Sequence, residues 1–169
     1  AATPAMVAYA AKLLPDDACF VPEKREELTT EGGLDVIAHR ARVKDAVARL
    51  QGRGIHASLF IDPDPTQIEA ARETGARGIE IHTGSYCKAG GVAREKELRA
   101  IVDAASFAQR LGLEVHGGHG LDYENVPPIA RIPEIVELNI GHSIIARAVM
   151  VGIEQAVREM KELLAKARA

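Results

Sequence analysis

Residues 58–82 read SLFIDPDPTQIEAARETGARGIEIH and contain a complete strand–helix–strand pattern. The apolar run 58–61 is typical of a buried strand. Asp64 can cap a helix that begins at Pro65 and ends near Gly75. The run 78–82 then predicts a second strand. Because a helix joins the two strands, they are expected to run parallel, with the helix crossing over one face of the sheet.

The same alternation continues on both sides of this unit. Further strands are expected at residues 18–21, 113–116 and 136–140. Apolar residues at helical spacing predict four further helices. The first begins at Thr3-Pro4, the second has Val43, Ala46, Val47 and Leu50 on one face, and the third carries apolar residues from Leu98 to Leu111. The last, at the end of the sequence, is expected to bury Val149, Ile153, Val157, Met160 and Leu164 along one stripe. The glycines at the exit of the third strand are expected to loosen it, and a short, proline-interrupted connection is expected over 125–132.

Five strands alternating with helices predict an α/β fold with a parallel sheet. No Gly-x-Gly-x-x-Gly loop follows a strand, which favours part of a TIM (β/α)8 barrel over a dinucleotide-binding sheet. A complete barrel takes ~250 residues, and this chain has 169. Residues 1–169 are therefore expected to form a single domain, an incomplete barrel of about five parallel strands in which roughly three at the front are absent.

Composition excludes several classes of protein. Hydrophobic residues make up 47% of the chain and charged residues 27%, so an ordered globular domain is expected. The formal charge of -3 provides no field that would attract nucleic acid or an anionic membrane. No apolar run reaches the ~20 residues that span a bilayer, and the first residues do not resemble a signal peptide. Cys19 and Cys87 show no disulfide or metal spacing, which favours the cytoplasm.

Polar residues gather where the predicted strands end. They are Glu23, Lys24, Arg25, Thr29 and Thr30 after the first strand, Asp62 after the second, Glu80, His82 and Thr83 at the third, His119 at the fourth, and Asn139 and His142 at the fifth. The carboxyl ends of barrel strands meet on one face, where barrel enzymes keep their active sites. We therefore expect a shared site at that face.

Two loops in this set suggest specific chemistry. Gly141-His142-Ser143 precedes a helix expected near Ile144, so backbone N–H groups and the helix N-terminus could hold a phosphate, although a simple capped turn is the alternative. His119 lies between glycines and can exchange a proton near neutral pH, although an ordinary loop histidine fits the same pattern. His116 and His119 form an H-x-x-H on a strand end, where the rings need not face the same side, and no metal site is predicted.

Two charged residues leave alternatives open. Glu80 lies within an apolar strand and needs either a partner or a catalytic task; the partner could be Lys24 or Arg25. Lys24 could instead be the Schiff-base lysine of an aldolase-like phosphosugar barrel. A third hypothesis is a non-catalytic half-barrel that only binds phosphate.

Several motifs resemble the pyridoxine 5'-phosphate synthases of vitamin B6 biosynthesis. They are VPEKREELTTEGGLDV at 21–36, SLFIDPDP at 58–65, IEIHTG at 79–84, GHGL at 118–121 and LNIGH at 138–142. The resemblance covers essentially the whole chain. It implies a transferase-class barrel enzyme that condenses 1-deoxy-D-xylulose 5-phosphate with 3-amino-2-oxopropyl phosphate, releasing phosphate and water, without metal or redox cofactor, and that assembles as a homo-octamer.

The resemblance also implies roles for residues. His119 would be the proton donor and Glu80 would stabilise a transition state. Thr29 would bind the deoxyxylulose phosphate, and Gly120, Gly141 and His142 would hold the aminoketone phosphate. Other catalytic groups of the family would lie upstream of Ala1, so the chain is expected to be a fragment that is inactive alone.

Overall fold

The computed structural model describes residues 1–22 and 32–169. It contains one parallel sheet of five strands, in the order β1-β2-β3-β4-β5. The strands are β1 (Asp17–Phe20), β2 (His56–Ile61), β3 (Gly78–His82), β4 (Glu114–Gly118) and β5 (Ile135–Asn139). Spatial order follows chain order, as in a barrel, and the prediction of a partial (β/α)8 barrel is confirmed.

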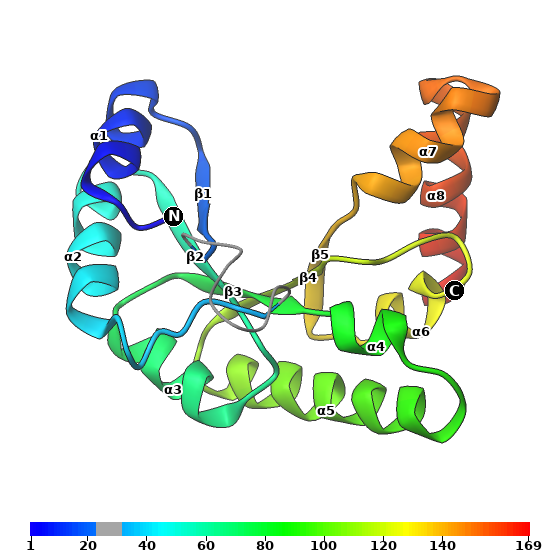
Figure 1. Ribbon diagram of the computed structural model, residues 1–169, viewed down its shortest axis with the longest axis horizontal. Coiled ribbons are helices and arrows are strands. Elements are labelled where there is room, and N and C mark those ends of the chain that lie inside the picture. Colours follow the sequence, from blue (N-terminus) through cyan, green and yellow to red (C-terminus); the bar gives the residue numbers. More distant parts are fainter. Residues whose placement is uncertain (23–31) are drawn as a thin grey trace.

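Helices lie around the outside of this curved sheet (Figure 1). They are α1 (Pro4–Leu13), α2 (Arg40–Gln51), α3 (Pro65–Glu73), α4 (Gly84–Lys88), α5 (Gly91–Arg110), α6 (Val126–Ala130), α7 (His142–Val151) and α8 (Ile153–Arg168). In Figure 1, α1 and α2 stand at the β1 end of an open arc, and α7 and α8 stand at the β5 end. No helix in the described ranges is both long and apolar enough to cross a membrane.

Local capping explains why the helix of the opening motif begins where it does. Asp64 has an extended backbone, and its Oδ1 accepts a hydrogen bond of 2.8 Å from the N–H of Thr66. Pro65 occupies the first helical position, where a missing N–H costs nothing. After α3, Gly75 takes a φ of +82°, which lets the chain turn back toward β3.

The core lies between the sheet and its helices. Leu59, Ile61, Ile79, Ile81 and Val115 are at most 1% exposed, and they occupy alternate positions that face outward. Removing side chains of this size from water stabilises the fold by about 1.5–3 kcal/mol each. The opposite, inward face of the sheet carries mostly polar side chains, and this face contains the candidate site.

The exits of the third and fourth strands differ from the prediction. The third strand's exit was expected to be a loose loop, but residues 84–88 form α4, in which the N–H of Cys87 donates to the carbonyl of Thr83. The fourth strand extends to Gly118 because Gly117 and Gly118 pair with both β3 and β5. Pairing on both sides offsets the low strand propensity of glycine.

The prediction of one continuous final helix with a single buried stripe is wrong. Gly152 has a φ of +84° and separates α7 from α8. The break prevents one stripe from running through both helices: Val149 is 80% exposed and Ile153 55% exposed, whereas Met160 is buried. Val157 is also exposed, and Leu164 is only partly buried against the core.

Candidate active site

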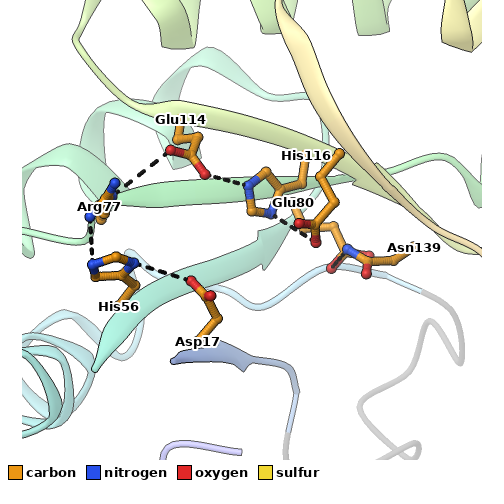
Figure 2. Close-up of polar contacts among 8 residues, drawn as sticks. Asp17, His56, Arg77, Glu80, Glu114, His116 and Asn139 are labelled. Atoms are coloured by element: carbon orange, nitrogen blue, oxygen red, sulfur yellow. Dashed lines mark hydrogen bonds and ion pairs between the residues drawn. The ribbon is translucent and has the colours of Figure 1, made fainter. Parts of the chain in front are cut away.

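Glu80 lies on the inward face of β3, the central strand, and its residue is only 9% exposed. Its Oε2 accepts a hydrogen bond of 3.1 Å from Nδ2 of Asn139 on β5 and a longer one, 3.6 Å, from the Sγ of Cys19 on β1. Figure 2 shows the Glu80 and Asn139 side chains pointing toward each other across the sheet. Three strands therefore converge on one carboxyl group.

The surroundings of Glu80 change its protonation. Burial raises the pKa of the carboxyl group, while the hydrogen bonds from Cys19 and Asn139 and the charge of His116 act in the opposite direction. Burial also raises the pKa of the Cys19 thiol, to about 12. Cys19 is therefore a protonated donor near neutral pH and not a thiolate nucleophile.

The expected ion-pair partners of Glu80, Lys24 and Arg25, lie outside the described residues. The partners that the structure records are a neutral amide and a thiol. A buried carboxyl group with neutral donors can hold or release a proton at a higher pH than an exposed one, as general acid–base chemistry requires.

A network of polar side chains, here called the polar network, extends across the sheet from beside Glu80 (Figure 2). Its members belong to β1, β2, β4, β5 and the residue before β3: Asp17, His56, Arg77, Glu114, His116 and Glu137. The shortest carboxylate contact joins Nε2 of His116 to Oε1 of Glu114 at 2.9 Å.

His116 therefore belongs to this polar network and does not form a pair of metal ligands with His119. Within residues 1–22 and 32–169, no three His, Cys, Asp or Glu side chains are grouped so that they could hold a metal.

His119 follows β4 in a backbone conformation with a φ of +79°, which few residues other than glycine adopt. The buried side chain of Thr83 fixes this turn: its Oγ1 lies 2.8 Å from the carbonyl oxygen of Gly118 and 2.7 Å from that of His119. Backbone strain of this kind at a loop is a recurrent feature of functional sites.

The imidazole of His119 packs beside two other rings. Its centroid is 5.0 Å from that of His82 and 6.3 Å from that of Phe60. Burial lowers the pKa of His119, and electrostatic interactions with His82 and Lys88 lower it further. Nδ1 of His82 lies 2.9 Å from Oδ1 of Asp62, and that hydrogen bond lowers the pKa of Asp62.

The predicted phosphate loop lies at the start of α7. Gly141 is the N-cap residue and His142 is the first helical residue, two positions earlier than expected. Both are exposed. A Cβ atom placed on Gly141 would meet nothing within 4 Å, so the space around this helix N-terminus is open. Backbone N–H groups at a helix N-terminus favour a bound anion.

One hydrogen bond ties this loop to the loop that follows β4. The hydroxyl of Ser143 donates to the carbonyl oxygen of Leu121 at 2.8 Å. Gly120, next to Leu121, has a φ of +79°, and a Cβ there would lie 3.0 Å from the Cβ of Cys87. The glycine loops at positions 120 and 141 are therefore linked at the carboxyl ends of β4 and β5.

The structure thus places Glu80, His119, Gly120, Gly141 and His142 toward one end of the sheet. Thr29 lies outside the described residues. Sequence reasoning assigned no role to Cys19 or Asn139 and did not identify the pairing of Asp62 with His82. The only signal was positional, because Asp62, His82 and Asn139 are polar residues at strand ends.

Comparisons with known proteins agree with this arrangement. The family described as "Pyridoxal phosphate biosynthesis protein PdxJ" matches residues 1–166. The chain is 57% identical over 165 residues to a pyridoxine 5'-phosphate synthase of Synechococcus sp. (strain JA-2-3B'a(2-13)), covering 97% of this chain and 69% of that protein. It is also 57% identical over 168 residues to a pyridoxine 5'-phosphate synthase of Magnetococcus marinus (strain ATCC BAA-1437 / JCM 17883 / MC-1), with coverages of 99% and 69%.

A third relative, from Legionella pneumophila (strain Paris), bears the same name and is 56% identical over 169 residues, with coverages of 99% and 68%. Among solved structures, the crystal structure of the Amycolatopsis orientalis BexX/CysO complex contains a chain that matches with a TM-score of 0.51 at 17% identity. The match covers 76% of this chain and 49% of that one, about half its length. At this identity the likeness concerns the fold alone.

Proposed function

The chain belongs to the PdxJ family of vitamin B6 biosynthesis, and from this premise we propose that it takes part in a transferase-class condensation at the carboxyl ends of its strands. The substrates are 1-deoxy-D-xylulose 5-phosphate and 3-amino-2-oxopropyl phosphate, and the products are pyridoxine 5'-phosphate, phosphate and water. The observation that supports this most directly is the buried carboxyl group of Glu80, which accepts hydrogen bonds from Asn139 and Cys19 on the inward face of the sheet. The loop that contains His119 follows β4, the strand next to β3.

His119 and Glu80 have complementary tasks. His119 donates a proton to a leaving hydroxyl or to a carbonyl, because ring closure proceeds through additions and dehydrations that need proton transfer. Glu80 stabilises the positive charge that develops in the transition state. Its partly desolvated position strengthens such an electrostatic interaction relative to water.

The phosphate groups need donors, and the linked glycine loops supply them. Gly120, Gly141 and His142 hold the phosphate of the aminoketone, with the open N-terminus of α7 directed at the anion. Thr29, on the segment outside the described residues, binds the phosphate of the deoxyxylulose substrate. The proposal requires no metal and no redox cofactor.

The described sheet has two free edges, at β1 and β5. We propose that additional strands close the arc between these edges and bring the remaining active-site groups. The longer relatives have enough residues for such strands, since this chain covers 69% of the Synechococcus protein. Closure would remove the unpaired edges, which are otherwise a liability for association. The complete enzyme then acts in the cytoplasm as a homo-octamer.

A complementation assay tests this proposal. Formation of pyridoxine 5'-phosphate is measured for this chain alone and for the proposed longer enzyme that also contains the additional strands, called here the full-length enzyme. It is also measured for this chain mixed with the complementary N-terminal segment of the full-length enzyme. The proposal predicts no product from the chain alone and product from the other two samples. His119→Gln should abolish product formation in both of them. Saturable phosphate binding without product in the full-length enzyme would instead support a non-catalytic phosphate-binding protein.

A further inference from the structure

His82 ends β3 with a side chain that is 3% exposed. One ring nitrogen, Nδ1, lies 2.9 Å from Oδ1 of Asp62, in the loop after β2. The other, Nε2, is fully buried and has no hydrogen-bond partner among the residues that the structure describes. A buried polar atom without a partner costs free energy. Because Nε2 lies beside His119, we expect it to form a hydrogen bond with that ring during the reaction.

The ionisation of Asp62 determines whether Nε2 of His82 is a hydrogen-bond donor or an acceptor. The hydrogen bond from His82 lowers the pKa of Asp62, so the carboxyl group is ionised and can only accept. Nδ1 of His82 therefore carries a proton. In the neutral ring the lone pair then resides on Nε2, which is an acceptor.

In the described part of the chain, His82 has two ring neighbours, Phe60 and His119, and only His119 has ring nitrogens that could donate to this acceptor. The two ring centroids are 5.0 Å apart and the rings are tilted by 57°. A hydrogen bond of about 3 Å between nitrogens, added to the distance from each ring centre to its own nitrogen, corresponds to a similar separation. Gly84 keeps this space free, because a Cβ there would lie 2.5 Å from Nε2 of His82 and 3.1 Å from Cδ2 of His119.

The two histidines differ in freedom. His82 is held by Asp62 and contacts the ring of Phe60 edge-on at 5.0 Å between centroids. His119 is on an exposed loop position. A small rotation of the His119 ring can therefore bring one of its N–H groups to the fixed nitrogen of His82.

We propose that His82, fixed by Asp62, is a positioning residue for His119. Nε2 of His82 accepts a hydrogen bond from one ring N–H of His119, which directs the other ring nitrogen at the substrate. To act as a proton donor, His119 first takes up a second proton; it then gives one proton to the substrate and keeps the other toward His82. This inference rests on the proposed function, in which His119 is that donor.

Nitrogen NMR of the histidine-labelled chain tests the resting state without any turnover. At neutral pH the spectrum should show His82 with Nδ1 protonated and Nε2 unprotonated. A His82 ring protonated on Nε2, alone or together with Nδ1, would overturn the proposal. Asp62→Asn provides the comparison, because losing the carboxylate charge should weaken the preference for this tautomer.

Kinetics of the full-length enzyme test the functional part. We expect His82→Gln to lower kcat about tenfold or more and to leave KM within about twofold, because substrate contacts persist while the proton donor is misaligned. Asp62→Asn should lower kcat in the same sense and by less. His39→Gln, at the N-cap of α2, is the matched control and should leave both constants unchanged.

The controls separate this inference from the proposed function. If His119→Gln retains turnover, the role of His119 itself fails. If His119→Gln is inactive but a folded His82→Gln keeps the wild-type kcat, only the positioning role is overturned. Circular dichroism establishes folding, and if His82→Gln does not fold, Asp62→Asn decides: an unchanged kcat overturns the proposal.

Discussion

The carboxyl group of Glu80, on β3, occupies the space that a side chain at Gly118, on the neighbouring strand, would need. A Cβ atom placed on Gly118 would overlap Oε1 of Glu80 and would also lie 3.1 Å from the Cβ of Asn139. The glycine therefore makes room for the carboxyl group between β3 and β5. Gly117 contrasts with it, since a Cβ there would face the other side, at 3.4 Å from a methyl group of Leu138.

The first prediction follows from this difference between two adjacent glycines. Gly118→Ala should lower the free energy of unfolding by about 1–3 kcal/mol, because the added methyl group displaces the Glu80 side chain. Gly117→Ala is the control and should cost less, because its methyl group meets only van der Waals contacts. Urea unfolding at neutral pH measures both variants. Equal losses would show that the carboxyl group does not need the space at Gly118.

The second prediction concerns the pH dependence of stability. Burial raises the pKa of Glu80 above the ordinary value of 4.5, so the folded state binds this proton more tightly than the unfolded state. The corresponding stabilisation is complete below the ordinary pKa and is lost as the pH rises through the raised value. Glu80→Gln removes that loss, so its stability relative to wild type should increase as the pH rises through this window. Urea titrations at several pH values measure the difference.

A control for this prediction is Glu69→Gln, at an exposed position on α3. The rise in relative stability with pH should be larger for Glu80→Gln than for this exposed variant. An equal or flat profile for Glu80→Gln would contradict the raised pKa of that carboxyl group.

The third prediction concerns Thr83. Its hydroxyl lies within hydrogen-bonding distance of the carbonyl oxygens of Gly118 and His119, and the residue is fully buried. Thr83→Val should destabilise the fold by about 1–3 kcal/mol, because it keeps the shape but leaves the carbonyl groups of Gly118 and His119 without this donor. Thr83→Ser, which retains the hydroxyl, should recover most of the loss. Thermal unfolding provides the comparison, and a serine variant as unstable as the valine variant would argue against the hydrogen bond.

The fourth prediction tests the phosphate loop. Gly141→Val should weaken binding of inorganic phosphate to the full-length enzyme at least about tenfold, or about 1.4 kcal/mol, because the side chain occupies the anion's space. Stability should change little, since a Cβ at Gly141 meets nothing. Gly90→Val is the matched control: Gly90 caps α5 and is equally open, but lies outside the proposed site. Titration calorimetry measures both, and equal phosphate affinities for the two variants would count against Gly141.

Much of the fold could be predicted because its signals are local. The segment from Asp64 to Gly75 contains its own cap, first-turn proline and terminal glycine, so the helix boundary depends on neighbouring residues only. The break at Gly152 was missed because an apolar period of 3.6 residues continues across it. One glycine within such a pattern is compatible with a continuous helix, and its positive φ arises only in the folded chain.

The sequence by itself determined the alternation of strands and helices, the parallel sheet, and the end of that sheet to which Glu80, His119 and Gly141 belong. These properties follow from the spacing of apolar residues and from chain connectivity. Only the tertiary structure decided the partners within the site. Cys19 and Asn139 reach Glu80 across 61 and 59 residues of chain, and Asp62 reaches His82 across 20. Such contacts depend on the register and curvature of several strands together, which no local pattern encodes.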